Sequence, residues 1–359
     1  MNQLAEITMA QEDQLFDRLQ VVEETLAKVA KVSEVSQIAR IEVRLREYMF
    51  LKWSNLANEA AKKAKAMVSS KKGAVKKAEA TAVIAAISKI MNGWQKTVGP
   101  RLKADIAKSY RLARYAGHKK ATGQSKGKLT YDTPEYKLVS KAEKKKIQIE
   151  PAFDVVDEEV VAAVSESQVH WIGEHYDESV RIVVADSVRQ TLKTGVSRKV
   201  AGERIQAAVR ESLDKIKTPT GFFGTSKEYF KGLAANAATV TRAHGQLRSF
   251  DLAGVTRYEI MNPQDEKTCP VCSHMDGKIF KVSHGVRQME AEMEAETPDA
   301  MKKIHPWLSL KALKAISPKS GAVGSKDAAS LADAGFALPP FHFICRCTVD
   351  MDTTEEPVF

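Results

Sequence analysis

The chain of 359 residues has only four cysteines, and none of them lies before residue 269. It contains no run of 18 apolar residues, so no membrane-spanning helix and no membrane partner are predicted. Residues 1–17 are polar and acidic and lack the apolar core of a signal peptide, which favours synthesis in a cytoplasm. In that reducing compartment a metal site is a better expectation for the cysteines than a disulfide framework.

Positive charge is abundant but unevenly spread. The formal net charge is +10, yet residues 62–146 hold 23 Lys/Arg against 5 Asp/Glu, a local charge of +18. Such a segment can neutralise a polyanion, and double-stranded DNA is the partner that it suggests. A solvated helical face without a ligand is the alternative, because arginine, the better phosphate ligand, is scarce there. The candidate DNA contacts are Lys119, Lys120, Lys126, Lys128, Lys144, Lys145 and Lys146.

Hydrophobic periodicity divides the chain into three parts. Its length predicts two or three domains. Apolar residues recur at helical spacing in residues 1–116, which predicts a helical N-terminal region with a helix stop at Gly99-Pro100. Residues 117–150 are rich in Gly and Lys and are expected to form a basic linker.

Residues 151–359 are expected to form an α+β domain. A helix should follow Ser197, and another should continue to Gly254 after a loop at residues 217–226. Strands are expected at residues 255–261 and 347–351, and Asp276-Gly277 predicts a tight hairpin turn. A long insertion covers residues 283–337. The expected fold class is therefore predominantly helical α+β, with short strands and a small cysteine-rich knuckle.

The cysteines form two close pairs about 70 residues apart. Cys269 and Cys272 have the spacing of a zinc knuckle, and Cys345 and Cys347 form a tighter pair with His342 three residues earlier. Four such ligands would complete a structural zinc site with no open position for water. Three alternatives stay open: a redox pair at Cys269 and Cys272, cysteines that serve as small core residues, and a disulfide formed in an assembled state.

An ordered set of motifs resembles the phage Mu F-like minor head proteins, the head-morphogenesis family of tailed phages. The set comprises Thr-Cys-Pro-Val-Cys at 268–272, Asp-Gly at 276–277, and Pro-Pro-Phe-His-Phe-Ile-Cys-Arg-Cys at 339–347. The resemblance covers roughly residues 178–351. The family usually has Pro-Asn where this chain has Phe343-Ile344, and often Thr-Glu where it has Ala243-His244.

The resemblance implies a structural virion protein. The sequence shows no paired carboxylates, nucleophile elbow or acid–base set, so an enzyme is not expected. Members of this family are minor head components that associate with the portal vertex during assembly, and some influence DNA delivery. The implied partners are the portal protein and the capsid or scaffold proteins, and the implied location is the phage head or portal vertex. Two other functions stay open: a zinc-containing DNA-binding protein, and a nuclease or transferase that uses Arg242 and His244.

Overall fold

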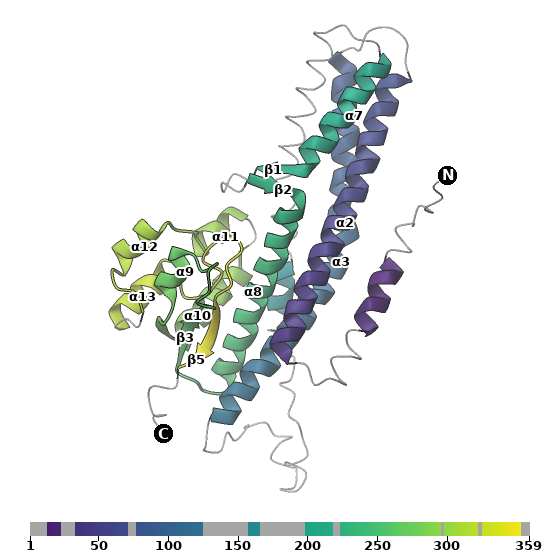
Figure 1. The fold of residues 1–359 in the computed structure, drawn as a ribbon. Helices are drawn as coiled ribbons and strands as arrows, with labels where there is room; N and C mark the ends of the chain where they lie inside the picture. The colour runs from purple at the N-terminus through teal and green to yellow at the C-terminus, as the bar shows by residue number, and fades with distance from the viewer. Residues whose placement is uncertain are drawn as a thin grey trace. The chain divides into compact units, whose positions relative to one another are not determined.

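A computed structural model describes residues 13–22, 33–70, 77–124, 157–165, 198–217, 223–295, 298–321 and 325–352. These residues are predominantly helical with two small antiparallel sheets, so the predicted α+β class is confirmed (Figure 1). None of the described helices combines the length and the apolar character that crossing a membrane would require. Contacts divide the chain into unit 1 (Met1–Val32, Arg40–Asp105 and Ser165–Ala234) and unit 2 (Ser33–Ala39, Ile106–Val164 and Ala235–Phe359).

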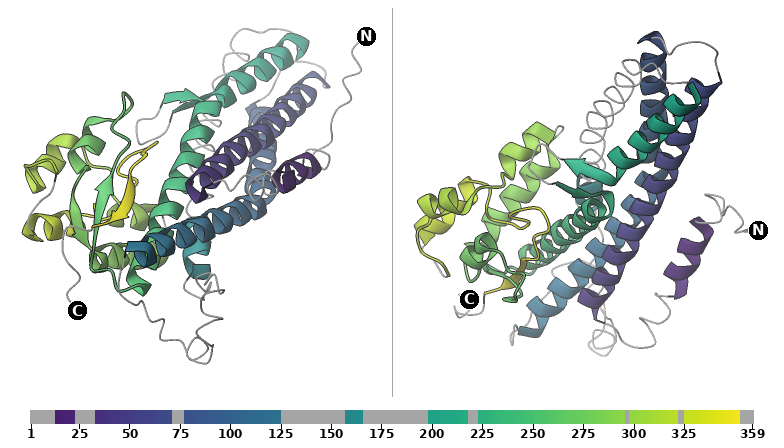
Figure 2. Two further views of the ribbon diagram at one scale, coloured as in Figure 1. Left: turned by 60° about the horizontal axis from the view of Figure 1, so that its bottom comes forward. Right: turned by 45° about the horizontal axis from the view of Figure 1, so that its top comes forward.

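Unit 1 is built from long helices. Helices α2 (Glu34–Ser69) and α3 (Lys77–Gln124) run side by side there, and α7 (Arg198–Asp214) lies along the end of α2 (Figures 1 and 2). Arg198 donates to the carbonyl oxygen of Val68 at 3.2 Å, which satisfies one of the last acceptors of α2. Aromatic rings fill the core, where Phe230 lies 5.8 Å from Trp53 and 5.6 Å from Trp94 between ring centroids.

Helix α3 passes through the expected stop at Gly99-Pro100, so that prediction was wrong. Pro100 lies inside the helix although it lacks the N–H that would bond four residues back. Its neighbours Val98 and Leu102 are both buried, and they belong to a row that follows the helical period. Packing of this apolar face outweighs the local cost of the proline. The buried row in unit 1 comprises Val83, Ile87, Met91, Trp94, Val98 and Leu102.

A short hairpin joins α7 to α8. Strands β1 (Lys215–Lys217) and β2 (Phe223–Thr225) pair antiparallel, so the expected loop at residues 217–226 contains a strand. Thr225 and Glu228 then form a reciprocal capping box, in which each side chain accepts the backbone N–H of the other residue, at 2.8 and 3.2 Å. This box fixes the start of α8 (Ser226–Leu252).

In unit 2 the later part of α3 packs closely against α8. A Cβ placed on Gly245 would lie 2.7 Å from Ala113 Cβ, and one on Gly117 would lie 2.9 Å from the Cα of Gln246. Both glycines therefore permit a backbone approach that a side chain would block. Residues 117–124 are consequently helical rather than part of a linker, a correction of the predicted boundary. The rest of the expected linker lies outside the described residues.

A three-stranded antiparallel sheet with order β4-β3-β5 anchors the rest of unit 2. Strands β3 (Arg257–Met261) and β5 (Thr348–Met351) confirm the two predicted strands. The predicted Asp-Gly hairpin was wrong: Asp276 caps helix α9 (Pro270–Met275), and Gly277, at φ +74°, turns the chain into β4 (Ile279–Lys281). The insertion forms α10 (Val282–Met293), α11 (Pro298–Ile304), α12 (Leu310–Ile316) and α13 (Ser325–Asp333).

Candidate metal centre

The first pair of cysteines lies at the start of helix α9. Cys269 is the N-cap residue in an extended conformation, and Pro270 occupies the first helical turn, where its missing N–H costs nothing. The Cys269 sulfur accepts the backbone N–H of Cys272 at 3.4 Å. The helical turn thus aims both side chains toward one point, as the knuckle spacing predicts. Cys272 is 5% exposed, whereas Cys269 is half-buried.

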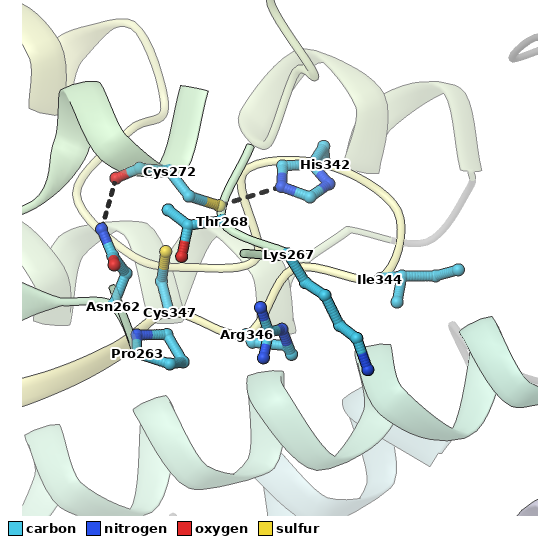
Figure 3. A pocket seen from close by; sticks show the side chains of 9 residues that line it. All are labelled: Asn262, Pro263, Lys267, Thr268, Cys272, His342, Ile344, Arg346 and Cys347. Atoms are coloured by element: carbon cyan, nitrogen blue, oxygen red, sulfur yellow. Dashed lines mark hydrogen bonds between the residues drawn. The ribbon is translucent and has the colours of Figure 1, made fainter. Parts of the chain in front are cut away.

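The second half of the centre comes from the loop that follows the insertion. The backbone N–H of Cys345 donates to the carbonyl of His342 at 3.1 Å, which closes a tight turn. Ile344 in this turn adopts φ 64°, a left-handed conformation that is costly for a β-branched residue. Cys345 and Cys347 are both buried. The turn therefore brings His342 and Cys345 close to Cys272 of α9, and Figure 3 shows His342 and Cys347 on the same side as Cys272.

The five predicted ligands form two overlapping groups of three. The ligand atoms of Cys269, Cys272 and His342 lie within 4.8 Å of one another, and so do those of Cys272, Cys345 and Cys347. Cys272 is common to both groups. Its sulfur lies 2.9 Å from His342 Nε2 and 3.7 Å from the sulfur of Cys345. Two sulfurs bound to one tetrahedral zinc ion lie about 3.8 Å apart, so this separation suits a shared ion.

The imidazole of His342 has the orientation that a metal ligand needs. Its Nδ1 lies 2.7 Å from the carbonyl oxygen of Phe343, which accepts a hydrogen bond when Nδ1 carries the proton. That bond would leave the Nε2 lone pair directed at the sulfurs of Cys269 and Cys272, at 3.1 and 2.9 Å. A hydrogen bond from the second ring nitrogen to a carbonyl is the usual way in which proteins orient a ligating histidine.

Ionisation of one thiol in the cluster makes ionisation of its neighbours less favourable. Hydrogen bonds from Cys272 and Cys347 hold the pKa of Cys345 well below its usual range. The same bonds to Cys345 raise the pKa values of Cys272 and Cys347, because each would have to ionise beside an existing thiolate. A bound divalent cation would supply the positive charge that lets these thiols ionise together. The donor set therefore fits a soft cation and can bind a metal ion.

Polar side chains outside the motif brace both halves of the centre. Arg346 forms a two-pronged ion pair with Asp265, with its Nη1 at 2.6 Å from Oδ2, and this pair ties the second cysteine pair to the loop before the first. Asn262 Nδ2 donates to the carbonyl oxygen of Cys272 at 3.0 Å (Figure 3).

Helix α8 supplies two further braces. Its Asn236 accepts the N–H of Ile344 at 3.2 Å, and its Thr239 donates to the carbonyl of Cys345 at 2.9 Å. Sequence reasoning missed Asn262, Asp265, Asn236 and Thr239. The turn-forming residues Asn262-Pro263 were a usable local signal for the loop, but nothing local marks Asn236 or Thr239, which lie over 100 residues before their partners.

The other predicted site residues lie elsewhere. Arg242 is half-buried; its Nε has no hydrogen-bond partner among the described residues, and burial lowers its pKa while Asp350 opposes that shift. His244 is 1% exposed, and its Nε2 lies 3.1 Å from Glu292. Lys119 is exposed, whereas Lys120 pairs with Asp350 at 2.8 Å. Five candidate DNA contacts lie outside the described residues: Lys126, Lys128, Lys144, Lys145 and Lys146.

No protein-family model, no curated protein and no solved structure matches the chain. The cysteine centre and the motifs that build it are therefore the features of the chain that indicate its function.

Proposed function

We propose that this protein is a structural minor head protein of a tailed phage that acts in head assembly at the portal vertex. The observation that carries the proposal is the convergence of the two halves of the family-like motif. Cys272 lies close to Cys269 and His342 in one group and to Cys345 and Cys347 in another, although an insertion of more than 50 residues separates the halves. A shared motif that forms one structural centre supports the resemblance better than scattered residues would.

We propose further that the bound ion is zinc and that its role is structural. Thiolate and imidazole ligands favour zinc, and five donors leave no position that must be filled by water. The ion would join helix α9 to the loop at residues 342–347 in unit 2. In this role His342 and the cysteines hold shape and do no chemistry.

Metal analysis of untagged protein tests the zinc centre. We expect one zinc ion per chain by plasma mass spectrometry. Serine substitutions at each cysteine and His342→Ala then identify the ligands: four of the five variants should lose the ion, and the fifth should keep it. Protein that folds without stoichiometric metal would contradict the proposed centre.

Capture by the cognate portal protein tests the proposed partner. The full chain and the portal should co-purify after co-expression, and the chain should sediment with procapsids or heads. A portal preparation that recovers none of the chain, while the chain retains its zinc and its melting temperature, would overturn the head-assembly role but leave the zinc centre intact.

A further inference from the structure

Helix α3 carries a row of lysines on its outer face in unit 1. Lys89, Lys96 and Lys103 are all exposed and follow one another at intervals of seven residues. Seven residues are just under two helical turns, so successive lysines rotate by only about 20° and lie about 10.5 Å apart along the axis. The three ammonium groups therefore form a stripe about 21 Å long on one side of the helix.

The lysine stripe (Lys89, Lys96 and Lys103) has no paired carboxylate in the part of the chain that the structure describes. Among the described residues, none of the three has an ion pair or a hydrogen bond. Between residues 80 and 124 the sole acidic residue is Asp105, which is buried and bonds Arg44 at 2.7 Å and Arg101 at 3.4 Å. Asp105 is thus already paired inside unit 1 and cannot neutralise the stripe.

The face that bears the stripe is open. A Cβ placed on Gly93 or Gly99, which flank Lys96, would meet no atom within 4 Å. Val98 and Leu102 point the opposite way into the core, so the stripe is not needed for packing. Packing would allow any polar or acidic residue at these positions, and all three are lysines that have no partner within the described ranges.

The length and the regular spacing of the stripe indicate the chemistry of its partner. At physiological ionic strength the Debye length is about 8 Å, so each lysine acts nearly independently and needs its own counter-charge. Duplex DNA presents one phosphate charge per about 1.7 Å, or roughly 12 charges over the length of the stripe. Lysines without neighbouring arginine forks or aromatic rings suit contacts to a phosphate backbone rather than to base edges.

We infer that the lysine stripe of α3 is a contact surface for the backbone of double-stranded DNA, bound without sequence preference. The inference adds a partner to the proposed head-assembly role, and it depends neither on the zinc centre nor on portal binding. It adds a DNA contact on helix α3 to the candidate contacts predicted at residues 119–146.

Titration of a 30-base-pair duplex at several salt concentrations, followed by fluorescence anisotropy, tests this inference with the full chain. We expect the triple substitution of the stripe to glutamine to weaken binding at least tenfold near 100 mM salt. The slope of log K against log salt should fall in magnitude by about 2 to 3, since each lost phosphate contact contributes about 0.9. The triple substitution to arginine should retain the affinity.

A matched control removes three exposed lysines elsewhere by Lys303→Gln, Lys311→Gln and Lys326→Gln, and this variant should bind like the unaltered chain. If the stripe and control triple substitutions weakened DNA binding equally, the inference would be overturned. Such a result would mean that only the net charge of the chain matters. Equal affinity for polyglutamate of the same total charge would overturn the assignment to DNA. Circular dichroism and portal capture of the stripe variant separate a lost DNA contact from misfolding and from a failed head-assembly role.

Discussion

Different kinds of contact stabilise the interior of unit 1 and the interior of unit 2. Unit 1 depends on long helices whose buried residues repeat with the helical period, such as Val98 and Leu102, and on aromatic packing around Phe230. The cysteine region of unit 2 has short elements joined by specific polar contacts, among them the Arg346–Asp265 pair. Many small apolar contacts tolerate single losses, whereas a few converging ligands do not. The comparison predicts sharply different responses to substitution.

Loss of Cys272 should have the largest effect, because this residue belongs to both ligand groups. We expect Cys272→Ser to lower the free energy of unfolding of unit 2 by about 4–5 kcal/mol, as loss of a structural metal ligand does. Hydrogen exchange should show the loss in β3 and α9 but leave the part of α3 before residue 106 protected. A strong chelator should reproduce the pattern in the unaltered chain. Equal loss of protection in both units would contradict the comparison.

The buried cluster of His244, Glu292 and His305 should give unit 2 a pH dependence. Burial raises the pKa of Glu292, but the flanking histidines His305 and His244 outweigh it and hold the pKa below its ordinary value of 4.5. Burial lowers the pKa of His305, yet Glu292, 2.9 Å away, outweighs it and raises that pKa above 6.5. The carboxylate therefore stabilises the fold above about pH 4.5, and the His305 contribution is full below about pH 6.5 and is lost at higher pH.

Glu292→Gln tests this cluster by denaturation across the pH range. Between about pH 4.5 and 6.5 the substitution should lower the free energy of unfolding by about 3–5 kcal/mol, because it leaves a buried imidazolium without its partner. The difference from the unaltered chain should shrink below and above this window. A difference that is constant with pH would mean that Glu292 contributes packing alone.

The close crossing of α3 and α8 should respond to a single methyl group. Gly245→Ala would place its Cβ 2.7 Å from Ala113 Cβ and 2.9 Å from the carbonyl oxygen of Tyr110, which we expect to cost about 1–3 kcal/mol. Gly93→Ala is the matched control in unit 1, since nothing lies within 4 Å of the new Cβ. It should raise the free energy of unfolding by about 0.5–1 kcal/mol, because alanine favours the helix. Thermal melts that rank the two variants the other way would contradict the close approach.

Ile344 should show the smallest effect, and one of the opposite sign. Its side chain is 37% exposed while its backbone is left-handed, so little burial offsets the strain. We expect Ile344→Asn to raise the free energy of unfolding by about 1 kcal/mol, because asparagine tolerates this conformation. Ile344→Val keeps the β-branch and should give no gain in urea denaturation. A gain with valine as well would assign the effect to exposed apolar surface instead.

The sequence predicted the helices and strands best where nearby residues alone determine the secondary structure. The apolar repeat identified the helices of unit 1, and the residues around Tyr258 and Val349 identified two strands of the small sheet. Predictions failed where packing overrode local signals. The sequence predicted a helix end at Pro100 and another at Gly117. Helix α3 instead continues through Pro100 because its neighbours are buried, and through Gly117 because it packs against α8. Asp276-Gly277 read as a hairpin turn because residues 270–275 gave no helical period of their own.

The sequence by itself determined the ligand types and their pairing in two close turns, because the reach of a helical turn or a tight turn is fixed within a few residues. It also determined the seven-residue spacing of the lysine stripe. Only the tertiary structure decided that the two turns meet, which of their sulfurs lie closest, and that Asn236, Thr239 and Asp265 brace them. It likewise decided which cations stay unpaired, as Lys120 finds Asp350 while Lys96 finds no partner among the described residues. Contacts across 70 to 230 residues depend on how distant elements pack, and no local pattern carries that information.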